Sequence, residues 1–262
     1  MNLQLQGKTA IVLASSKGLG FAAASALAEE GAQIMLVGRH EDTVAEAVRS
    51  IEERTGITPF STVADITKAQ DIEKVAAATI ERYGTVDILV NNCGGPAPGT
   101  FDDMDDTAWQ HGFELTLLSY VRSIRAVLPY MRQQKFGRIV NITSSAHKQP
   151  IENLVISSTL RVGVLGLAKT LAPELAKDNI LINTVGPGRF ATDRVLQLDE
   201  LAARAKQVRI EQIAEEERVR IPIGRYGEPE EMGRLIAFLA SPANSYMTGQ
   251  ALLADGGAVR SL

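Results

Sequence analysis

The 262-residue sequence predicts an α/β protein built on one doubly wound parallel sheet of about seven strands, with helices on both faces. Short apolar runs alternate with longer segments of helical period along almost the whole chain. Several of the runs are apolar throughout, as in strands covered on both faces. No Gly/Ser-rich or Pro-rich linker divides the chain. We therefore expect a single domain over residues 1–262.

The apolar runs place the strands at 9–13, 34–37, 58–64, 86–91, 138–143 and 180–185, with a further strand near 250–254. The helical periodicity covers 19–31, 41–55, 68–83, 104–131 and 153–178. Gly31 and Gly56 come at the ends of the first two helical segments, where glycine is common. The order strand, helix, strand favours parallel strands joined by right-handed crossovers.

The segment from about 194 to 220 breaks this alternation, because it is charged and helical with no strand between its pieces. It is either a surface insertion or a lid over a substrate cleft. We favour the lid, a helical substrate-loop insertion over about 189–220, because it follows a strand's carboxyl end, where open sheets bind ligands.

The composition excludes several classes of protein. The 27 Lys and Arg stand against 31 Asp and Glu, so the net charge of -4 lacks the basic footprint of a nucleic-acid binder. Cys93 is the single cysteine, which rules out an intramolecular disulfide framework and a Cys-rich zinc site. No run approaches the ~18 consecutive apolar residues of a membrane helix, and the first residues lack a signal-peptide core. We expect a cytoplasmic protein with no membrane or nucleic-acid partner and no metal site.

The first strand runs directly into a glycine-containing loop that opens the first helix. Glycine lets the backbone approach a ligand closely, and the free N–H groups of a helix N-terminus bind a pyrophosphate. A tight turn without a ligand is the alternative. The position of the loop favours dinucleotide binding, and it assigns to the cofactor the residues Ser15, Ser16, Lys17, Gly18, Leu19 and Gly20.

The end of the second strand bears on which nicotinamide cofactor is used. An acid there would bind a free ribose 2′-hydroxyl, whereas an arginine suits a 2′-phosphate. The sequence reads Val37-Gly38-Arg39, and Lys17 adds a second cation in the phosphate loop. Arg39 is either a solvated surface residue or a side chain that stacks on adenine and faces the phosphate. We expect NADP(H) to be preferred, with NAD(H) as the alternative.

At this point the chain resembles the short-chain dehydrogenase/reductase family, and within it the 3-oxoacyl-acyl-carrier-protein-reductase-like members. The motifs that carry the resemblance are Ala14-Ser15-Ser16-Lys17-Gly18-Leu19-Gly20, Asn91-Asn92-Cys93-Gly94, Pro187-Gly188 with Thr192, and Asp255-Gly256-Gly257. They span nearly the whole chain and imply a Rossmann-type fold. Ala14 stands where the family usually has glycine. Because alanine resists a positive φ, we expect this turn to use a conformation that alanine tolerates.

The resemblance also implies further cofactor contacts. Asp65 and Ile66 would contact the adenine, and Asn92 the adjoining ribose. The other positions that match the family's cofactor site are Cys93, Gly94, Arg161, Pro187, Gly188, Phe190 and Thr192.

The family's catalytic group is Asn–Ser–Tyr–Lys, and this chain keeps only the serine. Ser144 matches it at the end of the fifth strand. Ser157 stands at the tyrosine position, Arg161 at the lysine position and Thr116 at the asparagine position. We take all four as the candidate catalytic residues. The usual proton donor is therefore missing.

The replacements change what the site can do. An arginine cannot deprotonate, so Arg161 can bind ribose hydroxyls and supply charge but cannot relay a proton. A serine is a poor general acid, and loss of a positioned acid typically removes ~10²–10⁴-fold in rate. His147, three residues after Ser144, is either a substitute proton donor or a solvated bystander. We expect reduced or redirected activity rather than complete inertness.

The most direct hypothesis is an NADP(H)-dependent oxidoreductase. It would reduce an oxoacyl or ketone carbonyl, or an activated C=C bond, of a small molecule by hydride transfer, with non-standard proton delivery. A cofactor-binding sensor or scaffold without turnover and a lyase on the same fold are the alternatives. Arg189 and Arg194 are either exposed cations or contacts for an anionic group. The resemblance also implies a homo-oligomer, commonly a tetramer, joined by the helices at 104–131 and 153–178 and by the C-terminal strand.

Overall fold

The structure is a computed structural model that describes residues 1–261, and it confirms the predicted doubly wound sheet. All neighbouring strands are parallel, in the order β3-β2-β1-β4-β5-β6-β7. The strands are β1 (Thr9–Val12), β2 (Gln33–Gly38), β3 (Phe60–Val63), β4 (Ile88–Asn91), β5 (Gly137–Ile142), β6 (Ile180–Pro187) and β7 (Ala251–Ala254). The strand order reverses between β1 and β4, so a ligand crevice is expected at their carboxyl ends.

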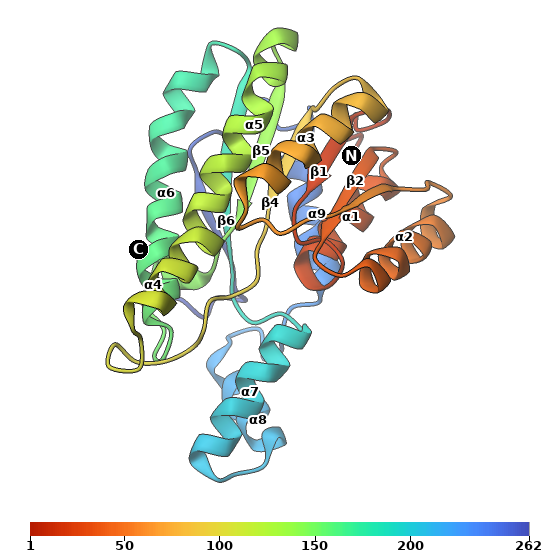
Figure 1. Ribbon diagram of the computed structural model, residues 1–262. Coiled ribbons are helices and arrows are strands. Elements are labelled where there is room, and N and C mark those ends of the chain that lie inside the picture. The colour runs from red at the N-terminus through yellow and green to blue at the C-terminus, as the bar shows by residue number, and fades with distance from the viewer. Residues whose placement is uncertain (262) are drawn as a thin grey trace.

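Helices cover both faces of this sheet, as predicted (Figure 1). One face is packed by α1 (Gly18–Glu29), α2 (Glu41–Thr55) and α9 (Pro229–Leu239). The other is packed by α3 (Ala69–Tyr83), α5 (Ser119–Gln134) and α6 (Val155–Ala176). By length and composition, α6 is the one helix within residues 1–261 that could cross a membrane; here it packs beside β6.

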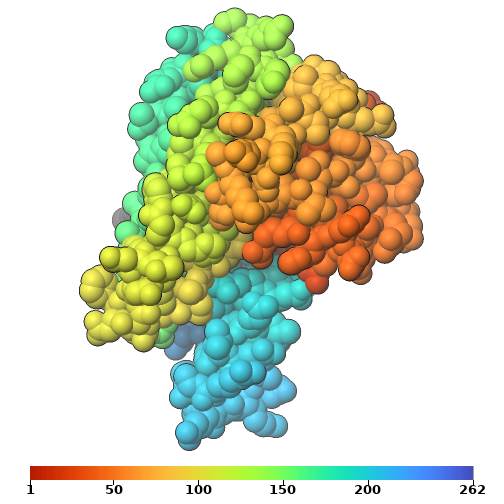
Figure 2. Space-filling model, viewed as in Figure 1, coloured from red at the N-terminus to blue at the C-terminus, as the bar shows by residue number. Residues whose placement is uncertain are grey.

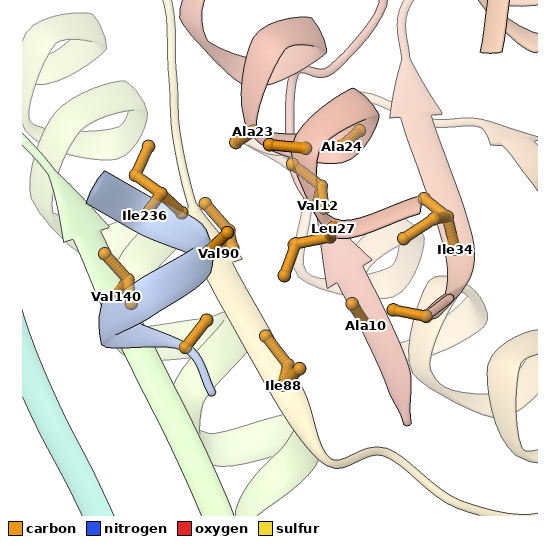
Figure 3. Packing of buried hydrophobic residues seen from close by; sticks show 14 of the residues in the cluster. Ala10, Val12, Ala23, Ala24, Leu27, Ile34, Ile88, Val90, Val140 and Ile236 are labelled. Atoms are coloured by element: carbon orange, nitrogen blue, oxygen red, sulfur yellow. The ribbon is translucent and has the colours of Figure 1, made fainter. Parts of the chain in front are cut away.

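Alternating strand residues supply the two halves of the core. Ala10 and Val12 of β1 pack with α1 and α9, whereas Ile11 between them packs on the opposite face. Figure 3 shows the first half, with Leu27 of α1 lying over the strands. The two covering helices approach closely because α9 has Gly233: a Cβ there would lie 2.5 Å from the carbonyl oxygen of Ala22. Any larger residue at 233 would push α1 and α9 apart.

The helical segment expected at 104–131 is not one regular helix. It consists of α4 (Asp106–Phe113), a π-helical turn (Glu114–Leu118) and α5. Thr116 lies in the π-helical turn, and its hydroxyl donates a 2.7 Å hydrogen bond to the carbonyl of Gly112. The periodicity of apolar residues could not reveal this turn, because a π-helical turn adds only one residue to the helical repeat.

The charged segment near 194–220 forms two helices, α7 (Asp193–Lys206) and α8 (Ile210–Arg220). They project from the rest of the molecule below the sheet in Figure 1, and the space-filling view shows them as a separate lobe (Figure 2). Buried Asp199 holds this pair to its base, because it accepts hydrogen bonds from the guanidinium of Arg189 and from the hydroxyl of Tyr226. Arg189 also pairs with Glu217 of α8 at 2.9 Å.

Candidate functional site

A cleft of about 820 Å³ opens between the loops that follow β1, β2, β3, β4, β5 and β6. This is the carboxyl edge of the sheet, where the strand order predicts a ligand. Predicted site residues that line it are Ser16, Lys17, Gly18, Leu19, Arg39, Asp65, Ile66, Asn92, Cys93, Gly94, Ser144, Ser157, Arg161, Pro187, Gly188, Phe190 and Thr192. Three predicted residues, Ser15, Gly20 and Thr116, are not among its lining.

The loop after β1 presents the N-terminus of α1 to the cleft. Gly18 has φ +57°, a left-handed conformation that favours glycine. Lys17 is the N-cap of α1, yet its side chain forms no cap with any described residue, and the first turn holds no acid. The amides at this helix end are therefore suited to an anionic ligand, and the positive end of the helix dipole favours one.

Ser15 and Gly20 support this loop from below. The hydroxyl of buried Ser15 donates to the carbonyl of Val12 at 2.7 Å and accepts from the amide of Val37 at 3.0 Å. It ties β1 to β2, so the expectation that it offers a hydroxyl to phosphate is corrected. Gly20 is a close-approach glycine, since a Cβ would lie 2.4 Å from the carbonyl oxygen of Ala14.

Ala14 adopts the conformation that we expected it to avoid. Its φ is +46°, in the left-handed region. The Asn92 amide donates to its carbonyl oxygen at 3.0 Å. The same oxygen faces Gly20. These contacts fix the turn in the left-handed conformation that a glycine would adopt easily. The backbone of Ala14 is therefore strained.

Cations gather at the end of the cleft beside β2 and β3. Arg39 follows β2 and Lys17 follows β1; both are exposed, and both line the cleft. Asp65 follows β3; burial alone would raise its pKa, but hydrogen bonds from Thr67, with Lys68 and Arg39 nearby, lower it. Its Oδ1 is bound to the amide and hydroxyl of Thr67, at 3.0 and 2.8 Å. The carboxylate is thus held by its own loop.

The loops after β4 and β6 form the other end of the cleft. Asn92 is hydrogen-bonded to the carbonyl of Ala14 in the loop after β1. Cys93 and Gly94 come next in the sequence and also line the cleft. Beyond β6, Phe190 is buried against Gly227. A Cβ added to Gly227 would lie 2.6 Å from the Phe190 ring. Thr192 is the N-cap of α7 and accepts from the amide of Val195.

Ser144, just after β5, and Ser157, on α6, line the same cleft. The Ser144 Oγ accepts a hydrogen bond from the amide of Ala146 at 3.1 Å. The Ser157 Oγ accepts one from Nε of Arg161 at 3.2 Å. In each bond the serine oxygen is the acceptor, so each hydroxyl hydrogen remains available as a donor. The sequence resemblance predicted these positions, but not this matched arrangement.

Arg161 is almost fully buried, at 5% exposure. Its hydrogen-bond neighbours are Ser157, the carbonyl of Ile142 at 3.4 Å and Sγ of Cys93 at 3.8 Å. Burial opposes its charge, but Cys93 and Tyr120 outweigh that and raise the pKa of Arg161. The guanidinium therefore stays charged at the floor of the cleft.

Tyr120 is a neighbour of the site that none of the sequence motifs indicated. It is fully buried on α5, donates to the carbonyl of Ile142 at 2.6 Å and lies 3.6 Å from Sγ of Cys93. Burial raises its pKa well above the ordinary value of 10. Tyr120 lies one helical turn after the predicted site residue Thr116, and this spacing was the one sequence feature that could have indicated its place near the site. It braces the floor of the cleft and is not part of the lining.

Thr116 and His147 are placed differently from the expectations. The Thr116 hydroxyl is fully buried and bonded within its own helix, so it does not reach the cleft. His147 is not a solvated loop residue: it is 7% exposed, and its Nδ1 lies 2.9 Å from the hydroxyl of Thr143. Burial, with Lys148 and Arg161 nearby, lowers its pKa. Neither residue lines the cleft.

Of the two arginines after β6, only Arg194 lines the cleft. Its Nη2 donates to the carbonyl of Pro96 at 2.9 Å, which links α7 to the loop after β4. Burial, and then the like charge of Arg161, lower the pKa of Arg194. Arg189 instead belongs to the ion-pair network at the base of α7 and α8.

Comparison with known proteins gives consistent matches over the chain's length. The model of the family described as enoyl-(acyl carrier protein) reductase matches residues 13–259. The 3-oxoacyl-[acyl-carrier-protein] reductase of Thermotoga maritima is 32% identical over 98% of this chain and 100% of its own. The NADPH-dependent reductase BacG of Bacillus subtilis is 32% identical over 97% of this chain and 99% of its own. The L-sorbose reductase of Gluconobacter frateurii, solved with NADPH and L-sorbose, superposes with a TM-score of 0.95 at 31% identity and covers 100% of both chains.

Proposed function

Because the chain belongs to the short-chain dehydrogenase/reductase family, we propose that it is an NADP(H)-dependent reductase of small oxo compounds. The reaction adds a hydride to a carbonyl carbon or to the β-carbon of an activated C=C bond. Ser144, Ser157 and Arg161 hold the oxygen on which negative charge develops. NADPH supplies the hydride when it is bound, and the chain supplies binding, orientation and charge stabilisation.

The shape and charge of the cleft fit a dinucleotide with a 2′-phosphate. The uncapped N-terminus of α1 suits a pyrophosphate, and Gly18 and Gly20 leave room for the backbone to approach it. Lys17 and Arg39 provide positive charge beside the adenosine end. Asp65, held by Thr67, follows β3 rather than β2, where an NAD-specific acid would stand. These residues support NADP(H) over NAD(H).

The single observation that carries the proposal is the arrangement of Ser157 and Arg161. Arg161 donates to the Ser157 oxygen, which polarises that hydroxyl and leaves its hydrogen for the cleft. Ser144 is prepared in the same way by the amide of Ala146. Two preorganised hydroxyl donors beside a buried positive charge form an oxyanion site. The site stabilises an oxyanion without a tyrosine.

This arrangement suits the reduction of an activated C=C bond better than that of an isolated carbonyl. Carbonyl reduction forms an alkoxide, whose strong basicity requires a proton donor at that oxygen. Conjugate addition forms an enolate, which the two serines and Arg161 can hold while its α-carbon takes a proton from water. Arg161 cannot give up its own proton. We therefore place enones and related conjugated oxo compounds first among the substrates.

The test compares cyclohexenone with cyclohexanone, which share a ring and an oxygen, by the loss of NADPH absorbance. The enone should be reduced at least tenfold faster, with the product saturated at C=C. NADPH binding is measured separately by the fluorescence of the bound nucleotide. Tight NADPH binding without oxidation across ketones, oxoacyl thioesters and enones contradicts the proposal.

Assembly and location form a second part of the proposal. We infer a cytoplasmic homotetramer, joined through α4–α5, α6 and β7 as the family resemblance suggests. Val162 on α6 is 49% exposed, which is consistent with a face available for such packing. Light scattering coupled to size exclusion measures the subunit number directly, and a monomer at micromolar concentration contradicts it.

A further inference from the structure

Two arginines reach the same short loop from different helices. Nη2 of Arg161, on α6, lies 3.8 Å from Sγ of Cys93. Nη2 of Arg194, on α7, donates to the carbonyl of Pro96 and lies directly over Gly95, where a Cβ would come within 2.7 Å of it. Both side chains line the cleft. Their guanidinium groups therefore converge on loop 93–96, beside the two serines.

Neither guanidinium is paired with a carboxylate of the described chain. Within residues 1–261, no ion pair includes Arg161 or Arg194. The acids on the cleft lining are Asp65, which is near Arg39, and Asp193, which is exposed. Arg189, five residues before Arg194, differs in this respect. It does not line the cleft, and it pairs with both Asp199 and Glu217.

Arg161 is buried and Arg194 is half-buried, and placing two like charges close together there without a carboxylate partner is unfavourable. Burial and Arg161 together lower the pKa of Arg194, which reflects this cost. The phosphates of a bound dinucleotide have cationic partners of their own in Lys17 and the N-terminus of α1. A negative charge on the second ligand would supply the missing counterion.

We infer that the substrate is an oxo acid, whose carboxylate is held by Arg194 with help from Arg161 while its oxo group faces Ser144 and Ser157. This inference rests on the proposed function, because it takes this end of the cleft as the substrate end. Guanidinium groups bind carboxylates through paired N–H donors. Arg194 comes from the projecting α7, so the carboxylate also joins α7 to loop 93–96.

The test uses a matched pair of conjugated oxo compounds, 2-oxo-4-phenylbut-3-enoate and its ethyl ester, which differ in the negative charge. The wild-type enzyme should reduce the acid with a kcat/KM at least tenfold above that of the ester. Arg194→Gln should raise KM for the acid at least tenfold and bring the two substrates close to parity. Arg194→Lys should recover part of the preference, because it restores the charge but not the paired donors. Arg204→Gln, an exposed arginine on the same helix, should change neither substrate.

A binding measurement separates this inference from the proposed function. Calorimetry of the enzyme–NADP⁺ complex with the same acid and ester requires no turnover. The anion site is supported if the wild type binds the acid more tightly than the ester and Arg194→Gln loses this difference. This result supports the site even if no reduction occurs. Equal binding of the acid and the ester, or an acid preference that survives Arg194→Gln, overturns it. NADPH binding by Arg194→Gln should stay within threefold of the wild type, which shows that the fold is intact.

Discussion

Nε of Arg161 donates a 3.2 Å hydrogen bond to Oγ of Ser157, one turn earlier on the same helix. The bond joins the two residues at the positions where the sequence resemblance would place the family's tyrosine and lysine. It turns a poor acid into an oriented hydrogen-bond donor, because the serine oxygen is occupied and its hydrogen is not. The two replacements therefore form one unit, and neither is expected to work with the family's original residue at the other position.

Replacement of Ser157 by alanine removes one donor from the oxyanion site. Loss of one such donor typically lowers kcat by ~10²–10³-fold, and we expect a fall in that range with little change in NADPH binding. Steady-state NADPH oxidation measures it. Thr159→Ala, on the exposed side of α6, is the control and should be neutral. A kcat within threefold of the wild type for Ser157→Ala would place the oxyanion elsewhere.

Replacement of Arg39 by alanine should weaken NADPH binding and leave NADH binding almost unchanged. A charge-assisted contact to a phosphate is worth about 1.5–3 kcal/mol, which corresponds to roughly 10–150-fold in Kd. Fluorescence titration with both nucleotides gives the ratio. Arg49→Ala, an exposed arginine on α2, should preserve the preference. An equal loss for both nucleotides shows that Arg39 stacks on adenine without reading the phosphate.

Glycine at position 14 should stabilise the protein. Ala14 has φ +46°, and the left-handed region costs a non-glycine residue roughly 1–2 kcal/mol. Part of that gain is lost to the greater freedom of glycine in the unfolded chain, so we expect Ala14→Gly to raise the free energy of unfolding by about 0.5–1 kcal/mol. Urea denaturation measures the change. Ala45→Gly, within α2, should instead destabilise by a similar amount. A destabilised Ala14→Gly protein would contradict the strain argument.

Substitution of Asp199 by asparagine should loosen α7 and α8. The buried carboxylate accepts from Arg189 and Tyr226, and burial with this bond raises the pKa of Tyr226 to about 12. Removal of one member of a buried pair typically costs about 3–5 kcal/mol. The loss should appear as faster tryptic cleavage within 194–220, with the sheet core intact. Glu215→Gln, which affects only the exposed pair with Arg218, should leave the cleavage rate unchanged.

Stability should decrease on mild acidification because of His147. Its folded pKa is lowered by burial, while the unfolded side chain titrates near 6.5. The unfolded chain therefore binds a proton that the folded one excludes, and the free energy of unfolding falls as the pH drops below about 6.5. Below the folded pKa the curve levels off. His147→Gln should flatten this part of the curve, whereas exposed His40→Gln should not; equal slopes in the wild type and His147→Gln would refute the assignment.

The sheet could be predicted because its signals are local. An unbroken apolar run such as Ile11–Leu13 fits only a covered strand here, and the glycines near helix ends have local causes. The cleft positions of Ser144 and Arg161 followed from the family motifs, and that of Arg39 followed from the end of the second strand. None of these depends on long-range contacts that the sequence hides.

The failures concern side-chain direction. Ser15 looked like a phosphate donor, but its hydroxyl bridges Val12 and Val37 across two strands. Thr116 points into the π-helical turn, and His147 is buried against Gly186 of β6, where an added Cβ would lie 2.4 Å from its Cε1. Ala14 keeps a positive φ because Asn92, 78 residues later, holds its carbonyl. In each case a partner distant in sequence, or an irregular turn, sets the outcome, and neither leaves a periodic signal.

The order in which the strands are synthesised determines when the cleft can form during translation. Its lining runs from Ala14 to Leu198, and the loop after β6 is made more than 160 residues after the loop after β1. At a synthesis rate of about 5–20 residues per second, the ribosome needs on the order of ten seconds or more to supply the second half. A nascent chain can pair β1 with β2 and β4 early, yet it cannot enclose a nucleotide until α7 has left the exit tunnel. The cleft is therefore completed only late in synthesis, after α7 has been made.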